Sequence, residues 1–219
     1  MIVHYFYTTS ALCYHPHMPA QSRATKLLRL AAKQPALSAR ELNEAGFPAR
    51  TLSRMTASGH LRRVGRGLYA GTDTPPSAHQ SAIEVSKLAP RAVLCLLSAL
   101  EIHGIGVQAP FEVWIALPAG THAPKGSTAA LRVTRLSGAA FTEGIETHVL
   151  DGAPVRVYSL AKTITDCFKL RGKVGLDVAL EALREAWTER KVTMDELWSF
   201  AQINRMTNVM RPYLEALAA

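Results

Sequence analysis

The sequence predicts an α+β protein with an N-terminal winged helix-turn-helix followed by a mixed α/β C-terminal domain. Three observations support this prediction. Residues 22–70 hold three helical patterns and then two short strand patterns around a glycine turn. Residues 72–77 are rich in Thr, Pro and Ser, as expected of a linker. After them helical and strand patterns alternate, which is typical of a sheet covered by helices.

The first two helices are predicted from apolar spacing and from their end signals. Apolar residues recur at helical intervals over residues 22–33, and Pro35 cannot continue that helix. Ser38 and Glu41 have the spacing of a capping box, in which each side chain satisfies a free backbone amide of the other. The second helix therefore begins at this box and ends at Gly46, a residue suited to a left-handed C-terminal cap.

A third helix, over residues 49–58 and closed by Gly59, has the pattern of a recognition helix. Helical spacing places small and basic residues on one face and apolar residues on the opposite face. The outward set is Arg50, Ser53, Arg54 and Ala57, and the inward set is Leu52, Met55 and Thr56. Any amphipathic surface helix shows such a pattern, so the interpretation depends on the segment after Gly59.

A basic hairpin comes directly after the third helix. Residues 60–64 and 68–70 read as two short strands around the turn Gly65-Arg66-Gly67, with Arg66 at the tip. Three helices and then a basic hairpin is the order of a winged helix, whose third helix enters the major groove of DNA. The residues expected to bind DNA are Arg50 and Arg54 at base edges, Thr51 and Ser53 at bases or phosphates, and Arg62, Arg63 and Arg66 at the backbone or minor groove.

The net charge of +8 is concentrated in the same segment. Residues 22–70 contain ten Lys or Arg, most of them Arg, and only two acids, Glu41 and Glu44. Residues 1–21 carry no charged side chain, and residues 71–219 carry equal numbers of each sign. Solubilising lysines would be spread along the whole chain, whereas a basic field confined to one small module is expected of a phosphate-binding surface. We therefore expect double-stranded DNA as a partner.

The remaining patterns define the elements of the C-terminal domain and the domain boundaries. Ser159 is expected to cap one helix, and Thr193 with Glu196 forms a second capping box. Helices are expected over residues 77–88, 98–103, 160–171, 176–190, 194–203 and 207–217, and strands over 92–96, 111–117, 131–136, 145–150 and 155–158. The expected division is a disordered or non-native extension (1–19), with Met18 as an alternative start, a winged-helix domain (20–71), a linker (72–77) and a C-terminal domain (78–219).

Composition argues against several classes of protein. The first residues lack the basic and continuously apolar regions of a secretory signal, and the most apolar stretch, residues 88–107, is interrupted by charges and a proline. The cysteines form no CxxC pair, which argues against a zinc site or a disulfide framework and favours the cytoplasm. We expect no cofactor, no metal and no membrane. The cysteines are Cys13, Cys95 and Cys167, and the histidines of the first segment, His4, His15 and His17, are taken as incidental.

No set of residues has a convincing catalytic pattern, so we expect no enzyme. Lys162, Asp166 and Lys169 share one helix face. They are either a stripe of ion pairs along the helix or an exposed binding surface. His103, next to Gly104, is more simply a cap or packing residue than a ligand. The acids of the C-terminal domain do not form the Asp…Glu-x-Lys pattern of a metal nuclease, which disfavours a nuclease guided by the winged helix.

Three segments resemble the AbiEi-family antitoxins, the transcriptional regulators of type IV (abortive infection) toxin–antitoxin systems. Residues 39–70, ARELNEAGFPARTLSRMTASGHLRRVGRGLYA, resemble their opening domain. Leu97–Gly104 resembles a family helix with Ser-Ala-Leu and a His-Gly end, and Val157–Lys169 resembles a helix with Lys-Thr and Asp.

The resemblance implies a function in phage defence. It implies an autorepressor that binds its own promoter, as a dimer or cooperatively, and counteracts a nucleotidyltransferase-like toxin without requiring a stable complex. We expect residues 78–219 to carry most of the toxin-neutralising activity, with the exposed Lys162, Asp166 and Lys169 as the first candidate surface. A winged-helix regulator that senses a small molecule or protein, with no toxin partner, stays open as an alternative.

Overall fold

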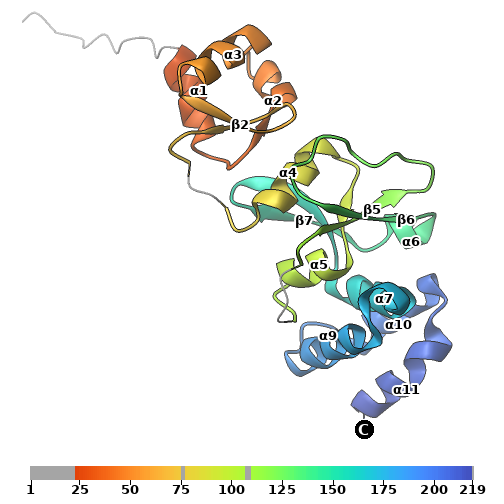
Figure 1. Ribbon diagram of the computed structural model, residues 1–219. Helices are drawn as coiled ribbons and strands as arrows, with labels where there is room; N and C mark the ends of the chain where they lie inside the picture. Colours follow the sequence, from red (N-terminus) through yellow and green to blue (C-terminus); the bar gives the residue numbers. More distant parts are fainter. Residues whose placement is uncertain (1–22, 75–76, 107–109, 219) are drawn as a thin grey trace, which may run out of the picture.

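The computed structural model describes residues 23–74, 77–106 and 110–218. The expected N-terminal extension, residues 1–19, therefore lies outside the described residues. Residues 23–71, here the N-terminal unit, combine helices with a small antiparallel sheet, and the described residues from 77 onward, the C-terminal unit, combine a mixed five-stranded sheet with helices (Figure 1). This arrangement confirms the mixed α+β class predicted from the sequence.

The N-terminal unit has the predicted order of elements, with one added strand. Its elements are α1 (Arg23–Ala31), β1 (Leu37–Ser38), α2 (Ala39–Glu44), α3 (Ala49–Ala57), β2 (Leu61–Gly65) and β3 (Leu68–Gly71). The capping box of Ser38 and Glu41 is confirmed, with both of its hydrogen bonds present. Strand β1 was not predicted, because two residues are too short to show a strand period. It pairs with β3 and makes the hairpin a three-stranded sheet of order β1-β3-β2.

The C-terminal unit contains most of the predicted elements. They are α4 (Gln80–Leu88), β4 (Val93–Leu94), α5 (Leu96–Ile102), β5 (Val113–Pro118), β6 (Leu131–Leu136), α6 (Ala139–Thr142), β7 (Ile145–Leu150), β8 (Ala153–Tyr158), α7 (Leu160–Lys169), α8 (Arg171–Val174), α9 (Leu176–Thr188), α10 (Met194–Asn204) and α11 (Thr207–Ala218). The single-turn helices α6 and α8 were not predicted. The capping box of Thr193 and Glu196 is confirmed. Ser159 lies at the N-cap of α7, but its side chain makes no capping hydrogen bond.

The five-stranded sheet separates two apolar layers. Its order is β6-β5-β4-β8-β7, with parallel pairs β5–β6 and β4–β8 and antiparallel pairs β4–β5 and β7–β8. Successive residues of a strand face opposite sides, so Ile115 packs with α4 while Trp114 packs with the helices of the other side. Figure 1 shows α4 on the side of the N-terminal unit and α5, α7, α9, α10 and α11 on the far side.

The two units contact each other directly. Ala36 and Val64 of the N-terminal unit pack into the apolar layer that α4 forms with the sheet. Lys87 of α4 forms an ion pair with Glu41 of α2 and donates a hydrogen bond to Gln34 Oε1 at 3.0 Å. Residues 23–71 are therefore not packed as an isolated body, and the predicted domain boundaries stay a prediction.

Candidate nucleic-acid interface

Helix α3 is held by its apolar face and exposes its basic face. It begins after Pro48, whose extended backbone (φ −66°, ψ 158°) turns the chain into the helix. Leu52 and Met55 are buried, in one cluster with residues of α1, α2 and β2. Figure 1 shows α3 at the end of the N-terminal unit that is turned away from the sheet of the C-terminal unit. The basic face is thus open to a large ligand.

The structure places the predicted base-reading residues on that open face. Arg50, Ser53 and Arg54 are exposed, and Thr51 is half-buried at the edge of the face. Thr56, predicted to face inward, is half-buried, and its hydroxyl donates to the carbonyl oxygen of Leu52 at 2.9 Å. The predicted division of α3 into an inner and an outer face is confirmed by burial.

The arginines of the β2–β3 hairpin differ in their surroundings. Arg62 is half-buried, and Arg63 is exposed with its Nε donating to the carbonyl oxygen of Gly65 at 3.1 Å. Arg66 and Gly67 form the two-residue turn between the strands, since Gly65 pairs with Leu68. Gly67 has φ +70°, a conformation that favours glycine. Arg66 therefore stands at the tip of the hairpin, as predicted.

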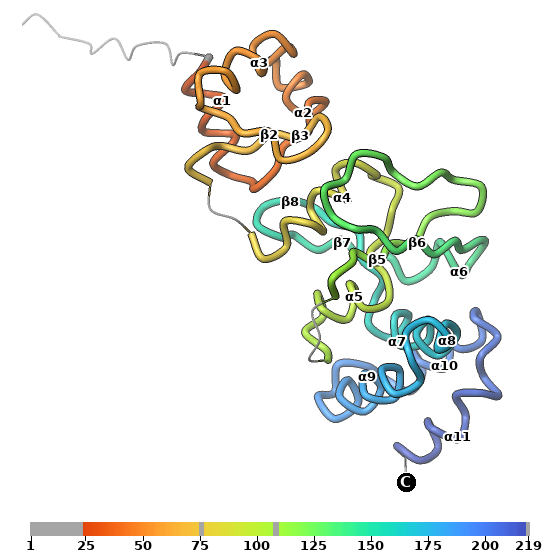
Figure 2. The backbone as a smooth tube through the Cα atoms, viewed as in Figure 1, coloured from red at the N-terminus to blue at the C-terminus, as the bar shows by residue number. Residues whose placement is uncertain are grey.

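The hairpin tip lies against the C-terminal unit, a contact that was not predicted. A Cβ atom on Gly126 would lie 2.8 Å from the Cβ of Arg66, so the loop between β5 and β6 meets the stem of that arginine. Next to the tip, a Cβ on Gly65 would lie 3.1 Å from Oε1 of Glu84. Glu84 is buried and accepts hydrogen bonds from the backbone N–H of Thr128 at 2.6 Å and from its hydroxyl at 2.5 Å. Figure 2 shows this loop beside the hairpin.

The expected exposed stripe on α7 is wrong for two of its three residues. Lys162 and Asp166 are buried, at 0% and 1% relative exposure, and only Lys169 is exposed. The error arose because the i, i+4 spacing predicts a contact between two side chains but says nothing of what covers them. Helix α7 packs against α5, α9 and α10, and Asn204 of α10 and Tyr158 of β8 contact the pair itself.

The buried pair belongs to a polar network inside the protein. Lys162 Nζ lies 2.6 and 2.5 Å from the two carboxylate oxygens of Asp166 and 4.5 Å from the centre of the Tyr158 ring. Asn204 Nδ2 donates to Asp166 Oδ1 at 2.7 Å. Burial lowers the pKa of Lys162 and raises that of Asp166, because removal from water penalises each charged form. With its partners inside the protein, this network has the character of a structural ion pair.

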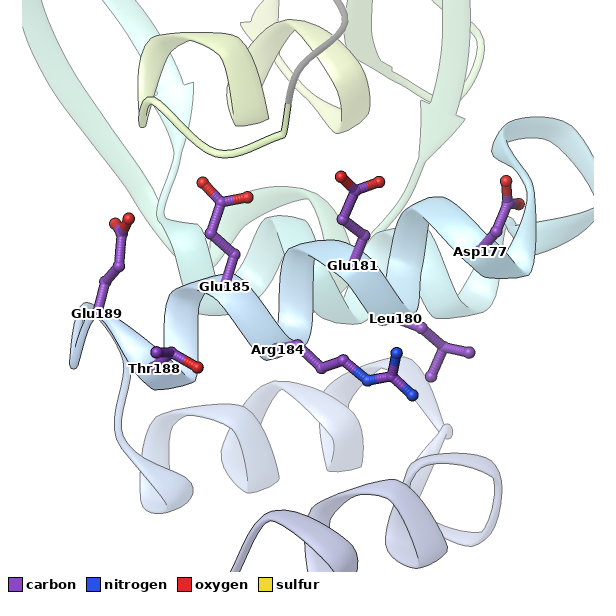
Figure 3. A pocket seen from close by; sticks show the side chains of 7 residues that line it. All are labelled: Asp177, Leu180, Glu181, Arg184, Glu185, Thr188 and Glu189. Carbon is purple, nitrogen blue, oxygen red and sulfur yellow. The ribbon is translucent and has the colours of Figure 1, made fainter.

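In contrast to the basic N-terminal unit, α9 and its C-cap residue carry a row of acidic side chains. Asp177, Glu181, Glu185 and Glu189 recur at every fourth position and project from the same side of α9 (Figure 3). Only Glu185 has a described backbone partner, since its Oε2 accepts a hydrogen bond from the N–H of Gly106 at 2.9 Å. The shallow hollow beside these acids is lined by this one segment alone, which also contributes Leu180, Arg184 and Thr188.

Two of the three cysteines lie in the described part of the chain. Cys95 and Cys167 are buried and free, and burial raises the pKa of both thiols, so they are protonated core residues. Cys13 lies outside the described residues.

Among the described helices none has both the length and the apolar character needed to cross a membrane.

Comparisons with known proteins point to the N-terminal unit. Residues 26–70, which run from α1 into β3, match the family described as "Transcriptional regulator, AbiEi antitoxin". No curated protein matches the chain significantly. The crystal structure of the RV2827C protein from Mycobacterium tuberculosis is similar, with a TM-score of 0.57 and 15% identity over 82% of this chain and 69% of that chain. At such identity the likeness concerns the fold alone.

Proposed function

We propose that this protein, whose residues 26–70 match the AbiEi antitoxin regulators, is a winged-helix repressor that binds the promoter of its own operon. The observation that carries the proposal is the exposed basic face of α3, where Arg50 and Arg54 point outward above the buried Leu52 and Met55. A helix anchored on one face and basic on the other fits the major groove. The concentration of the chain's positive charge in this unit supports the same assignment.

The contacts are assigned by the chemistry of each side chain. Arg50 and Arg54 have the forked guanidinium that pairs with guanine, while Thr51 and Ser53 hold a base or a phosphate. The hairpin residues Arg62, Arg63 and Arg66 add affinity that does not depend on sequence. Each of them that neutralises a phosphate should contribute about 0.9 to the slope of log K against log salt, and its replacement by Ala should remove that contribution.

The DNA assignment is tested at Arg54. Arg54→Ala should weaken binding to the promoter upstream of the gene by roughly tenfold or more, because a bidentate Arg–guanine pair discriminates by about 1–3 kcal/mol. Binding to unrelated DNA should weaken much less. Arg91→Ala is the matched control, since Arg91 is an exposed arginine of the C-terminal unit. Fluorescence anisotropy with both DNAs measures the difference, and an equal loss on both would reduce Arg54 to a phosphate contact.

We further propose that the protein is an antitoxin that counteracts a nucleotidyltransferase-like toxin encoded beside it, without a stable complex between the two. The support is the family description of residues 26–70. The surface for this activity is assigned to the C-terminal unit, and on α7 it is reduced to Lys169, because Lys162 and Asp166 are buried.

The antitoxin assignment is tested by growth. Co-expression of the full chain with the neighbouring toxin gene should restore growth, and Arg54→Ala should keep this rescue while losing repression of the promoter. Rescue that disappears together with DNA binding would show that the antitoxin acts only through repression. A chain that gives no rescue but still regulates its promoter would be a regulator without a toxin partner.

A further inference from the structure

Three side chains with metal-binding atoms meet where the sheet joins the helical layer. His103 is the C-cap residue of α5, and Glu146 and His148 lie on β7. Each offers one nitrogen or oxygen, and these three atoms all lie within 4.8 Å of one another. Glu146 and His148 face the same side of β7 because they are two residues apart on a strand. The two histidine rings meet edge to face, with centroids 5.2 Å apart.

The ring of His103 is fixed in a state that can bind a metal. Its Nε2 lies 2.8 Å from the carbonyl oxygen of Tyr158, which can only accept a hydrogen bond. Nε2 therefore carries the proton, and Nδ1 has the free lone pair of a neutral imidazole. Metal-binding histidines commonly donate their second ring N–H to a backbone carbonyl in this way, which fixes the tautomer and the ring orientation.

The surroundings leave room for further ligands. His103, Glu146 and Ser159 line one open hollow, and the buried Oγ of Ser159 has no hydrogen-bond partner among the described residues. This is the N-cap serine whose side chain does not cap α7. Its hydroxyl therefore makes no hydrogen bond with the described residues that would hold it in place beside His103 and Glu146. His148 Nε2 lies 3.1 Å from Glu146 Oε2, a contact that a bound cation would replace.

The neighbouring charges are already engaged elsewhere. Lys191 Nζ lies 2.7 Å from Glu189 Oε2 and donates to the carbonyl oxygen of His103 at 3.2 Å. Glu196, which also lines the hollow, accepts hydrogen bonds from Thr193 in the capping box of α10. The cation of Lys191 is therefore offset by a carboxylate, and Glu146 is left as the acid that faces both histidines.

We propose that His103, Glu146 and His148 bind one divalent transition-metal ion of the Zn²⁺ class. Two imidazoles and one carboxylate are a common ligand set for zinc with an open fourth position. This departs from the expectation of no metal, which rested on the cysteine spacing and treated His103 as a cap. The residues come from segments more than forty positions apart, so no local sequence pattern reveals them. A bound ion would tie the end of α5 to β7.

The test uses the full chain, purified without a histidine tag and stripped of metal by a chelator. Zn²⁺ titrated in competition with a chromogenic chelator should occupy one tight site and raise the Tm. Co²⁺ should give a visible absorption band characteristic of nitrogen and oxygen ligands. His148→Ala and Glu146→Gln should each weaken Zn²⁺ binding at least about tenfold, since even outer-shell changes commonly cost that much.

His122→Ala is the matched control, because His122 is exposed and lies outside the trio. It should bind Zn²⁺ as the unaltered chain does. If Zn²⁺ binds equally to all four proteins, other groups such as His4, His15 and His17 hold it, and the proposal is wrong. Absence of tight binding in the unaltered chain would overturn it as well. Glu146 is exposed, so Glu146→Gln keeps the test decisive even if His148→Ala folds poorly.

Discussion

Lys162 and Asp166 illustrate how far single residues can be understood from a sequence. Their spacing on one helix correctly predicted that they would pair, and the structure joins them at 2.5 Å. Their burial could not be predicted, because it depends on α5, α9 and α10 closing around α7. By contrast, the two faces of α3 could be predicted, because one apolar face packs on the rest of a small unit and the other is free.

Removing one member of this pair should be far more harmful than neutralising both. Lys162→Met leaves the carboxylate of Asp166 buried without its cation, and it should lower the free energy of unfolding by about 3–5 kcal/mol. The double variant Lys162→Met/Asp166→Asn should recover much of that loss, since the Asn side chain can still accept the hydrogen bond from Asn204. Urea unfolding measures both values.

A surface change on the same helix supplies the comparison for this prediction. Lys169 is exposed, so Lys169→Met should change stability by no more than about 0.5 kcal/mol. If Lys162→Met were as mild as Lys169→Met, the pair would be open to water in solution, contrary to its burial here.

At the scale of elements, the helix-capping signals were the most informative part of the sequence. Both predicted capping boxes are present, and most helices and strands lie within a few residues of their predicted bounds. The missed elements, β1, α6 and α8, have two to four residues and show no period of their own. The order of the sheet could not be predicted either, because β4 pairs in parallel with β8, whose paired residue Val157 is far along the chain from Leu94.

The acidic face of α9 gives a prediction for one element. Glu181 lies between Asp177 and Glu185 at i±4, so like charges repel along this face. Glu181→Lys replaces two repulsive pairs by two attractive ones, each worth about 0.2–0.5 kcal/mol, and should raise the urea midpoint.

Salt separates this electrostatic effect from a change in packing. The gain of Glu181→Lys should shrink at high salt, where exposed charges are screened. Glu181→Gln, which only removes repulsion, should give a smaller gain. A gain that is insensitive to salt would assign the effect to helix propensity and not to charge.

At the scale of the whole molecule, the two units share an apolar layer and an ion pair. Burial alone would raise the pKa of Glu41, but hydrogen bonds from Lys87 and Ser38 outweigh burial and hold that pKa below its ordinary value. A carboxyl group with a lowered pKa stabilises the folded state above its ordinary pKa, about 4.3. That contribution is lost as the pH falls through the folded-state value.

Acid should therefore weaken the contact between the units through Glu41. Between neutral pH and pH below about 4, the unaltered chain should lose more stability than Glu41→Gln, which keeps a capping-box acceptor but cannot titrate. Glu44→Gln, an exposed neighbour on α2, is the matched control. Identical acid dependence of the unaltered chain and Glu41→Gln would show that the Lys87–Glu41 pair does not form in solution.

Arg66, proposed above to contact DNA, packs against Gly126 of the loop between β5 and β6. If the proposed DNA contact of Arg66 requires its stem to leave Gly126, the free energy of that separation is subtracted from the affinity for DNA. A molecule that binds the released loop offsets this cost, and by thermodynamic linkage DNA strengthens its binding by the same factor. Such a protein could adjust transcription to the presence of a partner that never comes near the recognition helix.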